Sequence, residues 1–514
     1  MFPEPQLLLH SGTVLLDPVG GETSDALLLG GGRVLAAGAE ARAAAGRARP
    51  VDLGGRFLQP GFIDAHTHIP EFGLWLAYRD LAGAGSLADL LDAVSDEAAR
   101  LPDDEWVVVR NWDETAWPEG RMPARADLDR ACPDRPVLAM RVDMHMGVVN
   151  TPGLEWLGLR PADFGDGHLV EEPFFAAYEA VTPGFERRLA ALREAVRACH
   201  AEGVTAVHST LNADDFGLLQ AARDRGLLGV RVAGYLRVPA LEPLEALGLG
   251  AGFGDHRLRL AGLKVFVDGS VGARSAAFAA PYADAPGEHG GLLYTPGELR
   301  TLMRRCAERG LQPALHCIGD RAVAAALAAF AEAGVDAGLR PRLEHCEFFG
   351  EAEVAAMVER GAVASCQPNF VGEWGGPGGL YEQRLGPERA AAGNAYAELL
   401  AAGVPLAFGS DHMPFGPRYG LASAVAAPHA GQRLTSQQAL AAYTAGAAHA
   451  AFEEAERGHL RPGALADAVV LSADPREHGV DPQTLGVDLT VAGGGVVHDP
   501  HDLLREGGGH AAVQ

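Results

Sequence analysis

Two histidines separated by one residue follow an apolar run near the start of the chain. The run is 57–63, and His66 and His68 come after Asp64-Ala65. Residues two apart on an extended strand point to the same face, so both imidazoles can reach one point in space. Neutral imidazole is a preferred ligand of zinc and similar divalent metals. The pair alone is equally compatible with chance at a solvated strand end, so a metal site requires further ligands.

Other ionisable residues also stand at or near the ends of short apolar runs, namely His208, Lys264, His316, His345 and Asp411. A single histidine in such a place is more often a structural residue than a ligand. Several such residues that converge at one end of a barrel are hard to attribute to packing. Together they predict a metal or catalytic site.

Lys264 is the only lysine of the chain, since all other members of the 42 lysines and arginines are arginine. It lies inside an apolar run, where a lysine can become a neutral, nucleophilic amine while an arginine stays charged. Such an amine can form a Schiff base, or can react with CO2 to give a carbamate that bridges two metals. The alternative is a lysine whose stem packs and whose head reaches solvent.

Asp411 follows the apolar segment that ends in Phe408-Gly409-Ser410. A carboxylate there can bind a metal and accept the proton of a metal-bound water, whose pKa falls toward ~7. The alternative role for Asp411 is to cap the following turn.

Short apolar segments alternate with amphipathic helical segments through the middle of the chain. The expected strands are 57–63, 205–208, 230–235, 263–267, 313–316, 342–345, 362–365 and 406–409. Helices such as 187–201, 296–309, 321–333 and 351–360 are expected between them. Strand–helix alternation predicts a parallel sheet, and eight units predict an α/β fold with a closed (β/α)8 TIM-like barrel. Functional groups of such barrels lie at the carboxyl ends of the strands.

Three regions of different texture are expected. Residues 1–57 and 457–514 are rich in short strands and glycine turns, which predicts one small β-sandwich domain built from both chain ends. Residues 58–456 form the barrel. Residues 70–186 interrupt the alternation of strands and helices, and they hold five of the six tryptophans. Both features indicate an insertion after the first barrel strand.

The composition narrows the classes of partner. A formal net charge of -25 argues against nucleic-acid binding and against docking on an anionic membrane. We find no stretch of the ~20 apolar residues that a membrane span requires, and no signal peptide. The six cysteines form no C-x-x-C pair. Free thiols in a reducing cytoplasm are the simpler interpretation.

Taken together, these motifs resemble the amidohydrolase superfamily, and more closely amidohydrolase family 3 (YtcJ-like). The first motif is Pro60-Gly61-Phe62-Ile63-Asp64-Ala65-His66-Thr67-His68. The supporting segments are 111–114, 141–145, 263–270, 316–322, 344–347, 409–411 and 460–471. The resemblance covers nearly the whole chain. Two departures concern the expected pocket wall: Met144 stands where the branch commonly has glycine, and His412-Met413-Pro414 follows Asp411 in place of an aromatic-proline pair.

The resemblance implies a metal-dependent hydrolase that cleaves a C–N bond of amide, N-acyl or N-formyl type, other than a peptide bond, with a metal-bound hydroxide. It implies that His66, His68 and Asp411 hold one metal, most commonly Zn2+, and that His316 and His345 hold a second. Carboxylated Lys264 would bridge the two ions. Asp411 would pass the proton to the leaving nitrogen. Metal number varies across the superfamily, so a single ion is also compatible with the sequence.

Five residues are weaker candidates for contact with a small-molecule amide substrate: His145, Trp112, His208, Asp268 and Arg274. Trp112 is equally well explained as core of the insertion. Asp268 is a candidate for orienting a metal ligand, or a turn residue. Arg274 is a candidate carboxylate clamp. The sequence leaves the substrate and the oligomeric state open, including a homo-oligomer.

Two alternatives to an amidohydrolase remain. One is a catalytically silent, hydrolase-like binding or regulatory protein, although the full set of expected ligands is present. The other is an enzyme that uses Lys264 in a Schiff base, which the surrounding histidines disfavour.

Overall fold

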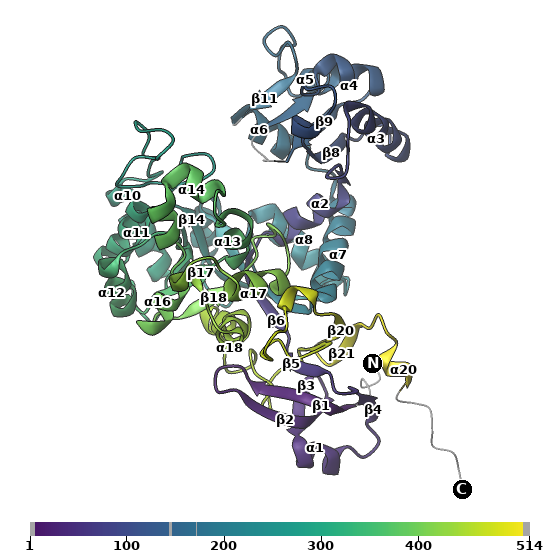
Figure 1. The fold of residues 1–514 in the computed structure, drawn as a ribbon, viewed down its shortest axis with the longest axis vertical. Coiled ribbons are helices and arrows are strands. Elements are labelled where there is room, and N and C mark those ends of the chain that lie inside the picture. Colours follow the sequence, from purple (N-terminus) through teal and green to yellow (C-terminus); the bar gives the residue numbers. More distant parts are fainter. Residues whose placement is uncertain (1–5, 143–145, 171, 507–514) are drawn as a thin grey trace. The chain divides into compact units, whose positions relative to one another are not determined.

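The computed structural model describes residues 6–142, 146–170 and 172–506 (Figure 1). The chain divides into two compact units, of which one combines Met1–Ile69 with Val196–Gln514 and the other is Pro70–Ala195. The insertion expected at 70–186 lies within the second unit.

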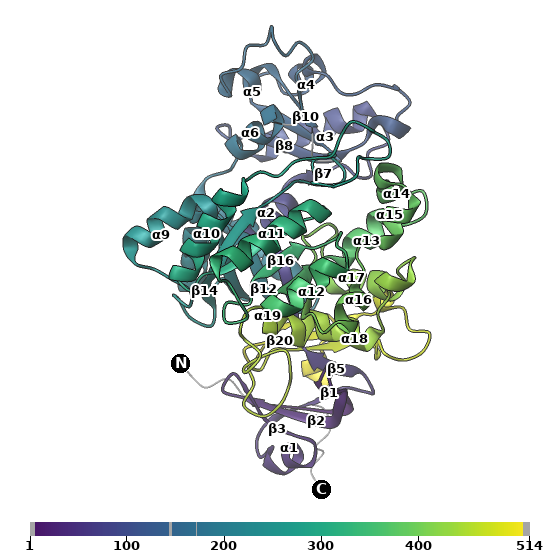
Figure 2. The same ribbon diagram turned by 90° about the vertical axis from the view of Figure 1, so that its left-hand side faces the viewer.

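The first unit contains the expected barrel of eight parallel strands. In sheet order they are β6 (Phe62–Thr67), β12 (Val204–Leu211), β13 (Arg231–Arg237), β14 (Leu258–Phe266), β15 (Gln312–Cys317), β16 (Arg342–His345), β17 (Val363–Cys366) and β18 (Leu406–Phe408). Most of their residues are buried, as expected for parallel strands covered on both faces. Helices α10 (Pro296–Glu308), α11 (Asp320–Ala333) and α12 (Glu351–Arg360) lie on the outer side of the strands (Figure 2). The predicted fold class is confirmed.

The first predicted strand, 57–63, is divided between two sheets. Phe57–Pro60 forms β5 of the chain-end sheet, and the barrel strand β6 begins at Phe62. The break falls at Gly61, where a Cβ atom would lie 2.4 Å from Oγ1 of Thr205. A glycine at the residue between the two strands accommodates this close approach.

The outermost strands of the barrel sheet, β6 and β18, face each other across a seam. There the backbone amide of Asp411 donates to the carbonyl of His66 at 2.8 Å, and the amide of Ser410 donates to Oδ1 of Asp64 at 3.0 Å. A Cβ atom on Gly409 would lie 2.3 Å from the backbone nitrogen of His66. The seam therefore depends on a glycine, and it holds Asp411 beside His66.

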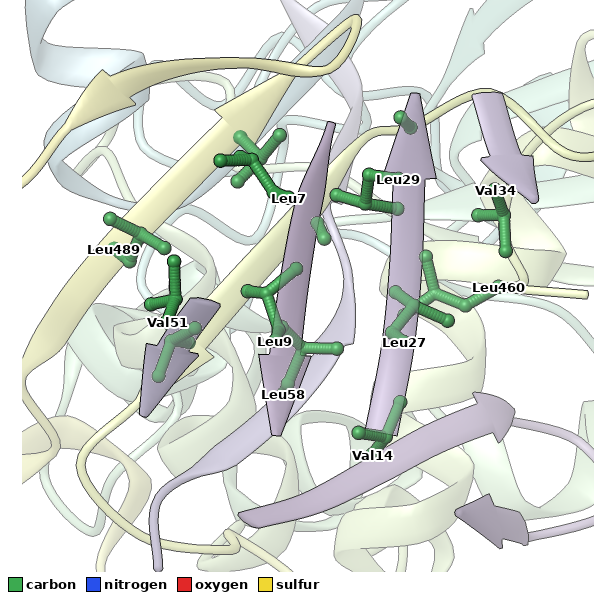
Figure 3. Packing of buried hydrophobic residues seen from close by; sticks show 14 of the residues in the cluster. Leu7, Leu9, Val14, Leu27, Leu29, Val34, Val51, Leu58, Leu460 and Leu489 are labelled. Atoms are coloured by element: carbon green, nitrogen blue, oxygen red, sulfur yellow. The ribbon is translucent and has the colours of Figure 1, made fainter. Parts of the chain in front are cut away.

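The two chain ends together form the second sheet of this unit, as predicted. Its strand order is β21 (Gly495–His498), β20 (Val487–Ala492), β19 (Ala468–Leu471), β5, β1 (Leu7–Asp17), β2 (Glu22–Gly30) and β3 (Arg33–Ala37), with β4 (Arg49–Asp52) paired to β1. Leu9, Leu27, Val51, Leu58 and Leu489 belong to its buried apolar core (Figure 3). Since β5 pairs with β19, residues from both ends complete one domain.

The second unit has its own sheet and core. Its strands run in the order β11 (His168–Val170), β10 (Met146–Val149), β9 (Val137–Arg141), β8 (Val107–Trp112) and β7 (Arg79–Asp80). Helices α3 (Leu87–Arg100) and α4 (Arg125–Ala131) pack against each other and contribute to its apolar cores. Among the described residues of the whole chain, no helix is long and apolar enough to cross a membrane.

The seam glycine generates a stability prediction. Gly409→Ala should lower the free energy of unfolding by about 1–3 kcal/mol, because the added methyl group overlaps the backbone of His66. Gly217→Ala in α8 (Ala213–Asp224) is the matched control, since its Cβ meets nothing within 4 Å. This exposed helical site should gain up to about 1 kcal/mol. Urea unfolding of both variants measures the difference, and equal stability of the two would contradict the close approach at Gly409.

Candidate metal centre

Four of the predicted ligand side chains meet near the carboxyl ends of the barrel strands. Nε2 of His66 lies 3.1 Å from Nζ of Lys264 and 3.9 Å from Oδ1 of Asp411. The ring of His345 lies 4.8 Å from that of His66, measured between centroids. One potential ligand atom from each of His66, His345 and Asp411 lies within 4.8 Å of the others, so these three can hold one metal ion.

The remaining two predicted ligands border the same group. Nε2 of His68 is 3.5 Å from Oδ1 of Asp411. The ring of His316 is 4.4 Å from that of His345, between centroids. Nε2 of His316 also lies 3.1 Å from the carbonyl oxygen of Gly269, which can only accept. His316 therefore carries its hydrogen on Nε2 when neutral, and Nδ1 is the nitrogen left for a metal.

Unusual backbone conformations end two of the ligand-bearing strands. His345 at the end of β16 and the following Cys346 have φ of 69° and 47°, and Asp411 and His412 after β18 have φ of 49° and 46°. Consecutive left-handed residues that are not glycine are uncommon and cost on the order of 1–3 kcal/mol each. Such strain persists only where the surroundings determine it. At both places the strained turn sets the direction of a candidate ligand.

Burial keeps the imidazoles neutral. Together with the nearby charge of Lys264, it lowers the pKa of His66 to about 4 and that of His316 to about 3. Burial also lowers the pKa of Lys264 to about 8, although Glu344 and Asp411 act in the opposite direction. At neutral pH the histidines are therefore in the form that binds metals, and the amine of Lys264 is closer to its neutral form than an exposed lysine.

The donor set fits a divalent metal such as zinc. It consists of imidazoles and a carboxylate, which are the ligands that zinc takes in catalytic sites. Nδ1 of His345 is buried and has no hydrogen-bond partner among the residues that the structure describes. A buried polar atom without a partner is costly, and a bound metal would satisfy it.

Sequence reasoning missed a buried pair beside this group, Arg342 and Glu344. Both belong to β16, and each is only 1% exposed. Glu344 contacts Nδ1 of His66 through Oε2 and accepts a hydrogen bond from Nε of Arg342 at 2.7 Å through Oε1. Burial opposes ionisation of Glu344, but Arg342 and His66 hold its pKa well below the ordinary value. The available signal was a pair of charged residues on either side of Leu343 in a short strand of the predicted barrel.

Asp64 is a third residue whose role was not predicted. Its carboxylate accepts the backbone amides of His66 and Ser410 and the hydroxyl of Ser410, which lies 2.5 Å from Oδ2. Burial raises the pKa of Asp64 to about 6, against the lowering effect of these bonds. Asp64 thereby links the strand of His66 to the strand that precedes Asp411.

Three of the weaker candidates have other partners. His208 is buried, and its Nδ1 accepts from Nη1 of Arg342 at 2.9 Å. Asp268 accepts three backbone amides, from Ala277, Ile318 and Gly319, and its Oδ1 lies 3.7 Å from Nε2 of His316. Arg274 forms an ion pair with Asp284 at 2.7 Å. Asp268 therefore holds loops beside a predicted ligand, and contact of these three residues with substrate stays a prediction.

The last two candidates belong to the second unit. Trp112 is fully buried in an apolar core and lies 6.1 Å from the ring of Trp117, between centroids. This is the packing role that the sequence also allowed. His145 lies outside the described residues.

Known proteins are similar to this chain over most of its length. Residues 49–498 match the amidohydrolase family. The chain is 28% identical to YtcJ of Bacillus subtilis, a protein that carries an amidohydrolase name, over 87% of this chain and 90% of that protein. It is 25% identical to the N-substituted formamide deformylase of Arthrobacter pascens, over 88% of this chain and 90% of that enzyme.

A solved structure extends the agreement to the fold. It is an uncharacterized metal-dependent hydrolase from Pyrococcus furiosus, with a TM-score of 0.83 and 30% identity, covering 92% of this chain and all of that one. The barrel and the chain-end sheet are thus a fold that this chain shares with a metal-dependent hydrolase. The chain therefore belongs to the amidohydrolase family.

Proposed function

We propose that this protein is a metal-dependent hydrolase that cleaves a C–N bond of amide, N-acyl or N-formyl type in a small molecule. The observation that carries the proposal is the gathering of buried neutral imidazoles, a carboxylate and the only lysine of the chain near the ends of the barrel strands. The N-formyl type among these bonds is supported by the name of the deformylase relative at 25% identity. The six cysteines are free, which supports a reducing cytoplasm as the location.

The proposed ligands fit two arrangements. In one, His66, His68 and Asp411 hold a first ion, His316 and His345 hold a second, and carboxylated Lys264 lies between them. In the other, His66, His345 and Asp411 hold a single ion. A divalent metal held by these residues would activate water as a nucleophile and polarise a substrate carbonyl.

The chain's own residues supply the proton transfer and the orientation. Asp411 is the only carboxylate of the predicted ligand set, and its Oδ1 faces Nε2 of both His66 and His68. We infer that it accepts the proton of the attacking water and delivers it to the departing nitrogen. Amide nitrogen is a poor leaving group until it is protonated, so one residue that performs both transfers suits C–N cleavage. The seam hydrogen bond from Asp411 to His66 keeps the carboxylate in place.

Replacement of Asp411 tests the proposed proton transfer. Asp411→Asn in metal-loaded protein should lower hydrolysis of N-formyl and N-acyl amines at least about 100-fold, because the amide cannot take up the proton. Asp92→Asn in α3 removes an exposed carboxylate of the second unit and serves as the control, with activity unchanged. Product amine is measured after loading with zinc, manganese or iron. Absence of hydrolysis by the metal-loaded wild type across such a panel would reject the proposed bond type, and full activity of Asp411→Asn would reject the role of Asp411.

The single lysine permits a direct test of carboxylation. Protein supplied with 13C-bicarbonate and zinc should show one carbamate carbon resonance that is absent from Lys264→Met. The amino terminus is the other amine and is common to both proteins, so the difference spectrum reports on Lys264 alone. Identical spectra of the two proteins would contradict the carbamate and favour the arrangement with a single ion.

A further inference from the structure

We propose that Glu344 and Arg342 are positioning residues that fix the tautomer of His66, so that its Nε2 is presented to the metal. This inference rests on the proposed function, because it concerns the same metal site. It assigns a task to two buried charged residues that take no part in the proposed hydrolysis. It also makes the metal affinity of the site depend on a residue that is not itself a ligand.

The tautomer follows from the partners of Glu344. Oε2 contacts Nδ1 of His66, while the same carboxylate receives Nε of Arg342 on Oε1 at 2.7 Å and Nη2 on Oε2 at 3.3 Å. A carboxylate that accepts from two guanidinium N–H groups is ionised, so it has no hydrogen to donate and can only accept. Nδ1 of His66 must therefore donate, and it carries the hydrogen of the neutral ring. Nε2 is left with a lone pair, and it faces Lys264 and Asp411.

Arg342 is unable to turn away from this arrangement. Its Nη1 donates to Nδ1 of His208 and to the hydroxyl of Tyr235, both at 2.9 Å. Its Nη2 donates to the carbonyl of Ala65 at 2.6 Å and to Oγ of Ser365 at 3.0 Å. Every N–H of the guanidinium thus has an acceptor, and rotation would leave buried donors without partners.

These contacts connect the positioning pair to the frame of the barrel. The partners of Arg342 come from β6, β12, β13 and β17, and Arg342 itself belongs to β16. Tyr235 in turn donates to Oε1 of Gln312 on β15 at 2.7 Å. The orientation of His66 is therefore set by six of the eight barrel strands. A histidine held only by its own strand would be free to present either nitrogen.

A purely structural role for the pair makes a different prediction. If Arg342 and Glu344 only fill and stabilise the barrel interior, their replacement changes stability and leaves the metal site of the folded protein as it was. If they act through His66, metal affinity and metal geometry change in protein that is still folded. Partners of this kind typically contribute about 10- to 100-fold to metal affinity.

The experiment compares Glu344→Gln, Glu344→Asp and the control Glu359→Gln, an exposed residue of α12. The affinity for Zn2+ is measured by competition with a chelator, and the absorption spectrum of the Co2+-substituted protein reports the ligand geometry. Circular dichroism confirms the fold.

The two replacements of Glu344 differ in what they offer to His66. The amide introduced by Glu344→Gln can donate to Nδ1 of His66 and so permits the wrong tautomer. The shorter side chain introduced by Glu344→Asp keeps a carboxylate acceptor, but draws it back from Nδ1. We therefore expect affinity to fall in the order wild type, Glu344→Asp, Glu344→Gln, with about 10- to 100-fold between the first and last and an altered Co2+ spectrum.

Several results would overturn the inference. One is wild-type affinity and an unchanged spectrum in folded Glu344→Gln, and another is Glu344→Gln binding as tightly as Glu344→Asp. If Glu344→Gln does not fold, Glu344→Asp decides alone, and an affinity within twofold of the wild type contradicts the inference. If the wild type binds no divalent metal, the proposed function itself is overturned. If the wild type binds metal and the Glu344 variants have the same affinity and spectrum, only the positioning role is overturned.

Discussion

A buried ion pair that must be fully hydrogen-bonded is the constraint on which the geometry of the candidate metal centre depends. Moving a guanidinium and a carboxylate out of water costs several kcal/mol of free energy for each ion. Close ion pairing and additional hydrogen bonds are needed to offset this cost. Arg342 and Glu344 are each 1% exposed, so water cannot replace their hydrogen-bond partners. The positions of these partners are therefore narrowly fixed. The pair therefore restricts where β6, β12, β13 and β17 can lie. The same restriction leaves one nitrogen of His66 facing the other candidate ligands.

The seam between β6 and β18 also helps to place the candidate ligands. Gly409 lets the backbone of β18 approach β6, and Asp64 bridges the two through its carboxylate. The left-handed backbone at Asp411 then turns its side chain toward His66 and His68. Fold closure and ligand placement thus use the same few contacts. Residues that look purely structural, such as Gly409, are expected to affect the site through its geometry.

Much of this arrangement could be predicted from the sequence, for local reasons. The H-x-H spacing of His66 and His68, the apolar runs that precede each polar strand end, and the isolated Lys264 are all visible within a few residues. Barrel topology then brings such strand ends together. The strand limits were less visible: 57–63 belongs to two sheets, because the close approach of Gly61 to Thr205 depends on a strand more than a hundred residues away.

The role proposed for Arg342 and Glu344 could not be predicted from local sequence patterns. Glu344 reaches His66 although β16 and β6 are not neighbours in the sheet, so no spacing in the sequence encodes their contact. The same is true of Arg274, whose ion pair with Asp284 depends on how a loop folds back. Trp112 had two equally good interpretations in the sequence, core packing and substrate contact, and its packing role became visible only with its neighbours in the second unit.

The most direct measurement is anomalous diffraction from a crystal of the zinc-loaded protein. We expect a zinc peak at the carboxyl ends of the barrel strands, bonded to Nε2 of His66 at about 2.0–2.1 Å and to a carboxylate oxygen of Asp411 at about 2.0–2.2 Å. Nδ1 of His66 should remain hydrogen-bonded to Glu344 in the same crystal. A crystal without a zinc peak at this place, or with zinc bonded to Nδ1 of His66, would contradict the metal centre described above.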